Sequence, residues 1–176
     1  MRLFIGTFLN SSYIIGNYTI LFNKLTKYID GKWVEPHNLH FTYNFIGEVE
    51  DEMAQQLISE LNPLLKEYKD KLEIKGITGF PNVWKPRQVV CKILNESHQI
   101  FELQKELTQI LKKLHFKTDE RQFTPHLTLV RVKNLQPEYS QFIKQYFNFS
   151  IGEVESYKIE LIKSELTRSG PIYSKL

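Results

Sequence analysis

The sequence of 176 residues lacks several features that define large classes of proteins. It holds a single cysteine, Cys91, which excludes an internal disulfide framework and a zinc site built from cysteines. One cysteine is also typical of a reducing, intracellular environment. No apolar run approaches the roughly 20 residues of a membrane-spanning helix, since the stretch at 3–9 is short and is followed by polar residues. We therefore expect a soluble, cytoplasmic protein.

The chain also lacks a strong excess of charge of either sign. Its 23 Lys and Arg against 20 Asp and Glu give a formal net charge of +3. This excess permits a phosphate-bearing partner, whereas proteins that bind duplex nucleic acid usually carry a denser basic stripe. Hydrophobic residues make up 41%, which is near the globular average, and the length fits one domain or two small lobes sharing a core.

Hydrophobic periodicity and turn residues predict alternating strands and helices. Pro63 lies inside the second helical pattern and is expected to kink or split that helix. The expected strands lie at 2–9, 38–46, 72–79, 87–94 and 123–132, with one or two more in 149–166, and the expected helices lie at 12–29, 51–64, 100–114 and 137–147.

The same order of elements occurs twice, which indicates an internal duplication. Leu9-Asn10 matches Leu94-Asn95 at an offset of 85 residues, and His40-Phe41-Thr42 matches His126-Leu127-Thr128 at an offset of 86. Strand–helix–strand order is common, so coincidence is the alternative. A duplication predicts one domain over 1–176, built from approximate repeats at 1–80 and 87–166. The two similar lobes would have corresponding strands facing each other across a groove.

Each repeat contributes one His-x-Thr motif on a strand. Side chains two apart on a strand share a face, so His40 lies with Thr42 and His126 with Thr128. Their apolar neighbours point the other way and can pack against helices. These neighbours are Phe41, Tyr43, Phe45, Leu127 and Leu129.

Two converging histidines suit acid–base chemistry. One neutral imidazole can accept a proton while one imidazolium donates another, and each role typically contributes about 10²- to 10⁴-fold in rate. The arrangement fits displacement at phosphorus without a metal. Threonine hydroxyls can donate to the non-bridging oxygens, and a nearby Arg or Lys can offset the developing charge.

Plainer interpretations exist for each residue. A histidine on a half-buried strand is often a hydrogen-bonded structural residue. His37 and His40 have a spacing seen in some metal sites, but three apart on a strand they face opposite sides, and no third ligand follows with matching spacing. Among the aromatic residues Trp33, Phe80 and Trp84, any could stack on a base, although core packing is the simpler interpretation. For Cys91, in an apolar strand, we expect an inert buried thiol.

Several segments resemble the two-histidine phosphoesterases, and most closely the bacterial and archaeal RNA 2′,3′-cyclic phosphodiesterases, also called 2′-5′ RNA ligase-like proteins. The resemblance runs nearly the whole chain. It is carried by the segments at 1–5, 33–42, 45–49, 123–132 and 164–173, which include both histidine motifs in order.

The resemblance implies an α+β fold with two pseudo-symmetric lobes of antiparallel sheet and outer helices around a central groove. It implies metal-independent hydrolysis of RNA 2′,3′-cyclic phosphate ends to 2′-phosphates, with no cofactor, and weak reversible 2′-5′ ligation of RNA ends. No obligate protein partner is indicated.

By the resemblance, His40 acts as general acid towards the leaving ribose oxygen and His126 as general base towards water, while Thr42 and Thr128 contact phosphate. The residues alone do not assign this order, because the repeat makes the two histidines nearly equivalent. The resemblance also makes Arg131 a phosphate contact. Because Arg131 lies five residues after His126, it reaches the groove only past the strand end or through a bulge. Tyr43-Asn44 departs from the usual pattern of the family.

Two other functions remain open. A phosphodiesterase for small cyclic nucleotides would use the same residues on another substrate. A nucleotide- or RNA-binding module with little turnover would keep the groove, although a pure binder has no need of an acid–base pair.

Overall fold

The computed structural model describes residues 1–176 and has an α+β fold. Its strands are β1 (Arg2–Phe8), β2 (Ile29–Trp33), β3 (His40–Glu48), β4 (Glu67–Tyr68), β5 (Leu72–Phe80), β6 (Gln88–Leu94), β7 (His126–Leu135), β8 (Ser150–Val154), β9 (Tyr157–Lys158), β10 (Glu160–Thr167) and β11 (Gly170–Lys175). Its helices are α1 (Ser12–Leu25), α2 (Asp51–Leu61), α3 (Gln99–Lys113) and α4 (Tyr139–Phe142), with 3₁₀ turns η1 (Pro36–Asn38) and η2 (Ile143–Tyr146).

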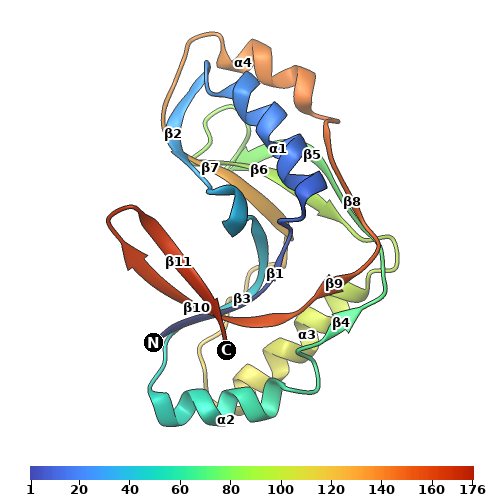
Figure 1. Cartoon of the computed structure of the whole chain (residues 1–176), viewed down its shortest axis with the longest axis vertical. Helices are drawn as coiled ribbons and strands as arrows, with labels where there is room; N and C mark the ends of the chain where they lie inside the picture. Colours follow the sequence, from blue (N-terminus) through green and yellow to red (C-terminus); the bar gives the residue numbers. More distant parts are fainter.

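Two antiparallel sheets form the two lobes. The first has the strand order β11-β10-β1-β3 and the second has the order β2-β7-β6-β5-β8, while β4 and β9 form a small separate pair. In Figure 1 the first sheet lies in the lower half with α2 and α3, and the second lies in the upper half with α1 and α4. The expected fold class of two antiparallel lobes with outer helices is confirmed.

The two halves of the chain cross over between the lobes. Helix α1 follows β1 of the first sheet but packs against β8 of the second. Helix α3 follows β6 of the second sheet but packs against β3 of the first. Strand β5 pairs with β6, and β10 pairs with β1, so each lobe contains strands from both halves. The hydrophobic core is accordingly continuous, with 35 buried residues in one cluster.

Helix α1 is shorter than its sequence pattern predicted. Ser11 caps its start by accepting the Ile14 N–H, and residues on one face are buried down to Leu25. The prediction of a helix to residue 29 is wrong, because Ile29 begins β2 and pairs with Leu135 of β7. Sheet pairing at a β-branched residue outweighs the continuing 3.6-residue pattern.

Proline accounts for two further boundaries. Helix α2 ends at Leu61, so Pro63 follows the end of the helix and does not kink it. Strand β7 begins at His126, three residues later than expected, because Pro125 has no N–H to donate to a neighbouring strand. The histidine is therefore the first residue of its strand.

The strands expected in 149–166 correspond to β8 and most of β10, but the sequence patterns missed β11 and therefore the hairpin of β10 and β11. In Figure 1 this hairpin projects from the lower lobe, away from the helices. Asn38 ties it to the first half of the chain by donating to the Pro171 carbonyl at 3.1 Å. Its register places Tyr173 opposite Ser164. Short strands with polar residues on both sides give little period-2 signal.

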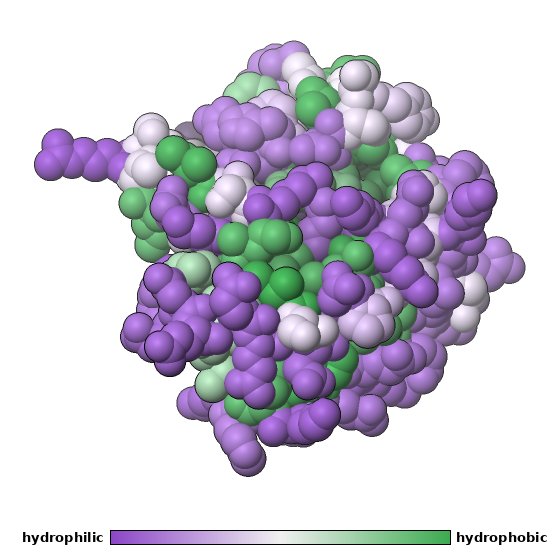
Figure 2. Space-filling view, turned by 60° about the horizontal axis from the view of Figure 1, so that its bottom comes forward, coloured by the Kyte–Doolittle hydropathy of each residue, from purple (hydrophilic) through white to green (hydrophobic).

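The molecular surface is mainly polar. Figure 2 shows hydrophilic residues over most of one face, with hydrophobic residues in smaller areas between them. The most exposed large hydrophobic side chains are Phe45 and Leu166, at 71% and 70%. None of the helices has the length and apolar character needed to cross a membrane.

A buried hydroxyl joins α1 to the second sheet and provides a test of the packing. The Tyr18 hydroxyl donates to the Val34 carbonyl at 2.7 Å, and the Val34 N–H donates to the Leu129 carbonyl of β7 at 2.9 Å. We expect Tyr18→Phe to lower the free energy of unfolding by about 1–3 kcal/mol, because the half-buried Val34 carbonyl loses its donor. Urea unfolding measures this change. Tyr13→Phe on the exposed face of the same helix is the control, and an equal loss in both variants would contradict the role of this hydrogen bond.

Candidate active site

His40 and His126 occupy equivalent places in the two sheets. Each is the first residue of its strand, and the two strands, β3 and β7, are in contact. His40 lies opposite Phe8 on β1, and His126 lies opposite Lys92 on β6. We call the side of each sheet that carries its histidine the histidine face.

Both imidazoles are held by the same hydrogen bond. Nδ1 of His40 donates to the Asn38 carbonyl at 2.6 Å, and Nδ1 of His126 donates to the Thr124 carbonyl at 2.7 Å. A carbonyl oxygen can only accept, so the proton of each neutral ring is fixed on Nδ1. Nε2 of each ring is then free to accept a proton, or to donate one when the ring is charged.

Burial lowers the pKa of both histidines below the ordinary value. The hydrogen bonds to Asn38 and Thr124 act against this effect, since each favours the charged ring. The positive charges of His126 and Arg131 further lower the pKa of His40. His126 and Arg131 both lie on β7, so their charges act on His40 across the contact between β3 and β7.

A β-bulge interrupts each histidine strand at the same distance from its histidine. In β3, Thr42 pairs with Gly6 and Asn44 with Ile5, so Tyr43 is the extra residue. In β7, Thr128 pairs with Val90 and Val130 with Val89, so Leu129 is the extra residue. Each bulge reverses the alternation of side chains in the residues that follow it.

The bulge in β7 resolves the geometric difficulty with Arg131. A regular strand would turn this residue away from His126, but after the bulge it shares the histidine face. Its charge acts on His40 and also on the Tyr173 hydroxyl. Arg131 itself is exposed, with no acidic partner.

The corresponding bulge in β3 overturns an expectation for Phe45. Its side chain was expected to pack against a helix, but it is exposed, and its ring lies 6.1 Å from that of Phe4 on the histidine face. Asn44 takes the buried position instead and donates to Thr108 of α3 at 2.9 Å. Phe45 therefore occupies the position in the first sheet that corresponds to that of Arg131 in the second sheet.

The two threonines have different surroundings. Thr42 lies opposite Gly6, which has no side chain that could crowd the Thr42 hydroxyl from β1. A Cβ added at Gly6 would approach the Phe41 carbonyl to 2.8 Å, so the close packing here requires glycine. The Thr128 hydroxyl donates to Oε1 of Gln88 at 3.3 Å. Both threonines are half-buried and can present a hydroxyl to a group between the sheets.

The sequence patterns did not identify the aromatic residues around His40. Its ring lies 5.1 Å from Phe4, 6.1 Å from Phe8 and 5.1 Å from Tyr173. Tyr173 comes from the hairpin, and its segment was part of the family resemblance, which was the available signal. Burial raises the pKa of Tyr173, while the charges of Arg131 and Arg2 act in the opposite direction.

Of the three aromatic residues considered for base stacking, only Phe80 lies at the site. Its ring is edge-on to His126 at 4.8 Å. Trp33 packs against Phe22, and Trp84 packs against Phe147, so neither joins the histidines.

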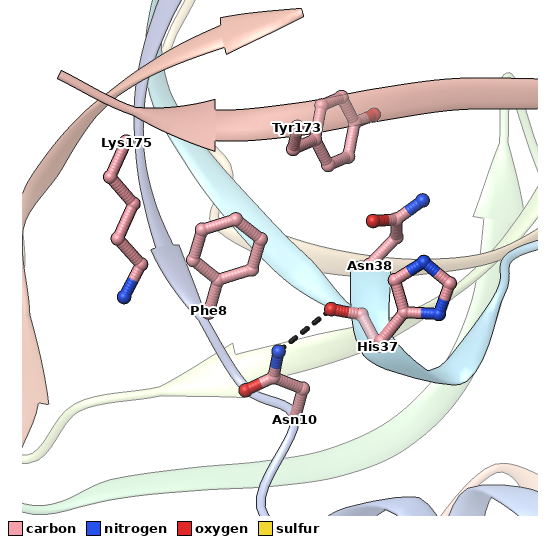
Figure 3. A pocket seen from close by; sticks show the side chains of 6 residues that line it. All are labelled: Phe8, Asn10, His37, Asn38, Tyr173 and Lys175. Carbon is pink, nitrogen blue, oxygen red and sulfur yellow. Dashed lines mark hydrogen bonds between the residues drawn. The ribbon is translucent and has the colours of Figure 1, made fainter.

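A small pocket of about 140 Å³ adjoins His40. Figure 3 shows the six residues that line it: Phe8, Asn10, His37, Asn38, Tyr173 and Lys175. His37 is exposed, and its carbonyl accepts from Asn10 at 2.7 Å. Nowhere in the chain do three or more His, Cys, Asp or Glu side chains form a group that could hold a metal ion.

Comparison with known proteins places these observations in a family. The sequence profile described as LigT like Phosphoesterase matches residues 19–90 and 93–173. An Archaeoglobus fulgidus protein named RNA 2′,3′-cyclic phosphodiesterase is 35% identical over 100% of this chain and 98% of its own. A Methanocaldococcus jannaschii protein of the same name is 38% identical over 81% of this chain and 80% of its own.

Solved structures have the same fold. The Thermus thermophilus protein TT0787 superposes with a TM-score of 0.81 at 26% identity, over 100% of this chain and 95% of its own. Escherichia coli LigT complexed with 3′-AMP superposes with a TM-score of 0.74 at 19% identity, over 99% of this chain and 94% of its own, a likeness that concerns the fold alone. The profile match and the full-length relatives show that this chain belongs to the LigT-like phosphoesterase family.

Proposed function

We propose that this protein is a metal-independent phosphodiesterase that hydrolyses RNA 2′,3′-cyclic phosphate ends to 2′-phosphates. The observation that carries the proposal is the matched pair of histidines, each held through Nδ1 with Nε2 left free. The family relatives named RNA 2′,3′-cyclic phosphodiesterase supply the substrate class.

The reaction needs one neutral and one charged imidazole. Nε2 of His126 removes a proton from water as the water oxygen attacks phosphorus. The bond from phosphorus to the ribose O3′ breaks, and Nε2–H of His40 donates its proton to that oxygen. The products are a 2′-phosphate and a 3′-hydroxyl, with the two histidines left in exchanged protonation states.

The remaining residues stabilise the charge that develops on the phosphoryl oxygens. Thr42, and Thr128 once its hydroxyl rotates away from Gln88, donate hydrogen bonds to the two non-bridging oxygens. Arg131 offsets the added negative charge, because preorganised donors and cations act most strongly where charge appears in the transition state. The order of acid and base follows the family resemblance, since the two rings have nearly equivalent hydrogen bonds.

The same groups serve ligation when a 5′-hydroxyl replaces water. The hydroxyl oxygen attacks the cyclic phosphate, O3′ departs, and a 2′-5′ phosphodiester forms. By microscopic reversibility His40 and His126 then exchange roles in the cleavage of that linkage. We include weak ligation in the proposal on this chemical ground.

We also propose that the single domain over 1–176 arose by duplication of a unit found at 1–80 and 87–166. The shared Nδ1 hydrogen bonds and the bulges at Tyr43 and Leu129 support this proposal, since both features recur at an offset of 86 residues.

A cytoplasmic location belongs to the same proposal. Its support is the one cysteine of the chain, Cys91, a free thiol whose pKa burial raises to about 12. Such a buried thiol does not depend on an oxidising compartment and is chemically inert.

Replacement of either histidine tests the function. We expect His40→Ala and His126→Ala each to reduce hydrolysis of an RNA 2′,3′-cyclic phosphate by about 10²- to 10⁴-fold, because each loses a proton-transfer group. Chromatographic identification of the phosphomonoester should give the 2′-phosphate, and a chelator should not change the rate. Circular dichroism checks that the fold persists.

His115→Asn is the matched control for these variants. It removes an exposed imidazole, and asparagine tolerates the positive φ of 63° at this position. Tight binding of a 2′-phosphate product without hydrolysis would favour a binding module instead. Faster turnover of a small cyclic nucleotide than of RNA in a parallel assay would favour a phosphodiesterase for small cyclic nucleotides.

The pH dependence tests the role of Arg131. Because burial lowers both histidine pKa values, we expect kcat/KM to peak below the ordinary histidine pKa of about 6.5 and to fall as the pH rises. Arg131→Met removes a positive charge that lowers the pKa of His40. Its kcat/KM should therefore be smaller, and the pH of its maximum should be higher. Arg121→Met, which removes a guanidinium paired with Asp119, is the control, and an unshifted maximum in Arg131→Met would contradict this role.

A further inference from the structure

The pocket beside His40 has no part in the acid–base chemistry described above. It shares a wall with the site, because the rings of Phe8 and Tyr173 contact the His40 ring and the Asn38 carbonyl accepts the His40 Nδ1–H. A group bound there would lie next to the proposed general acid. It would therefore lie on the side of the ribose whose O3′ receives the proton.

Hydrogen bonds fix the orientation of both asparagine side chains in the pocket. Nδ2 of Asn10 donates to the His37 carbonyl at 2.7 Å, and Nδ2 of Asn38 donates to the Pro171 carbonyl at 3.1 Å. Both partners are carbonyl oxygens, which can only accept, so neither amide can be reversed. Each Oδ1 is therefore left as an acceptor, and Figure 3 shows the Asn38 oxygen directed toward the space between Asn38 and Phe8.

The other lining groups suit a flat, partly polar ligand. The rings of Phe8 and Tyr173 both line the pocket (Figure 3), with centroids 6.4 Å apart and planes tilted by 52°. Lys175 supplies a cation 5.5 Å from the centre of the Phe8 ring and pairs with the buried Glu160 carboxylate at 2.8 Å. The volume of about 140 Å³ is less than the roughly 300–1,000 Å³ of pockets that hold whole drug-sized ligands. It fits one planar ring system.

We propose that this pocket binds the base of the nucleotide that carries the cyclic phosphate and favours bases with an exocyclic amino group. The inference rests on the proposed function, because the assignment of His40 as acid places that ribose beside the pocket. Aromatic rings accept any base by stacking, so the polar groups must provide the discrimination.

Cytosine and uracil differ at the edge that this pocket would contact. Cytosine presents an amino group next to a ring nitrogen, which is a donor beside an acceptor. Uracil presents a carbonyl oxygen next to an N–H, which is the reverse. The amide oxygens of Asn10 and Asn38 with the ammonium of Lys175 match the pattern of cytosine, whereas a uracil carbonyl facing an amide oxygen leaves both acceptors unpaired.

Two dinucleotides that differ only in the terminal base test the proposal. Both carry the same 5′ nucleotide and end in a 2′,3′-cyclic phosphate, one on cytidine and the other on uridine. We expect the wild type to hydrolyse the cytidine substrate with a kcat/KM about 2- to 10-fold higher, as one hydrogen bond contributes. Asn10→Ala should lower kcat/KM for cytidine and leave that for uridine unchanged. Asn23→Ala on the exposed face of α1 is the matched control and should keep the preference.

A binding measurement separates failure of the pocket from failure of the function. Calorimetry with cytidine 2′-phosphate and uridine 2′-phosphate should show tighter binding of the cytidine product, and Asn10→Ala should abolish the difference. Hydrolysis of both dinucleotides at equal kcat/KM, or an equal loss on both in Asn10→Ala, would overturn the base preference while leaving the phosphodiesterase intact. Absence of hydrolysis of either substrate by the wild type would instead overturn the proposed function, and the product affinities would then decide the base preference alone.

Discussion

The candidate site depends on one hydrogen bond made twice, from a histidine Nδ1–H to the carbonyl of the residue two positions earlier. This bond fixes the tautomer and limits rotation of each ring, so Nε2 of both imidazoles is available between the sheets. It depends in turn on an irregular backbone before each strand, at the η1 turn before His40 and at Pro125 before His126. A regular strand would have engaged those carbonyls in a sheet ladder.

A symmetric framework here carries an asymmetric set of side chains. At equivalent positions the first sheet has Phe8 and Phe45, and the second has Lys92 and Arg131. The first histidine face is therefore aromatic near His40, and the second is basic near His126. This difference suits a reaction in which the nucleoside lies near His40 and the attacking water lies near His126. In the proposed reaction, the two nearly equivalent histidines serve different roles because their neighbours differ.

Much of this arrangement could be predicted from sequence, because the alternation in His-x-Thr motifs directly reports which side chains share a face. Strands β3, β5 and β6 and helix α3 were expected within one or two residues. Periodicity did not reveal the bulges, since an extra residue leaves no signal until pairing is known. The positions of Phe45 and Arg131 therefore required the structure. Tyr173 and the pocket beside His40 were also missed, because they form only when the C-terminal hairpin folds back on β1.

The assignment of His40 as acid and His126 as base is the central chemical claim, and the leaving group offers its most direct measurement. A cyclic phosphate with sulfur in place of the bridging O3′ has a leaving group that departs without protonation. Rates of hydrolysis of the oxygen and sulfur substrates would be compared for the wild type, His40→Ala and His126→Ala. We predict that His40→Ala recovers most of its lost rate on the sulfur substrate while His126→Ala does not. Recovery in His126→Ala, or in neither variant, would contradict this assignment.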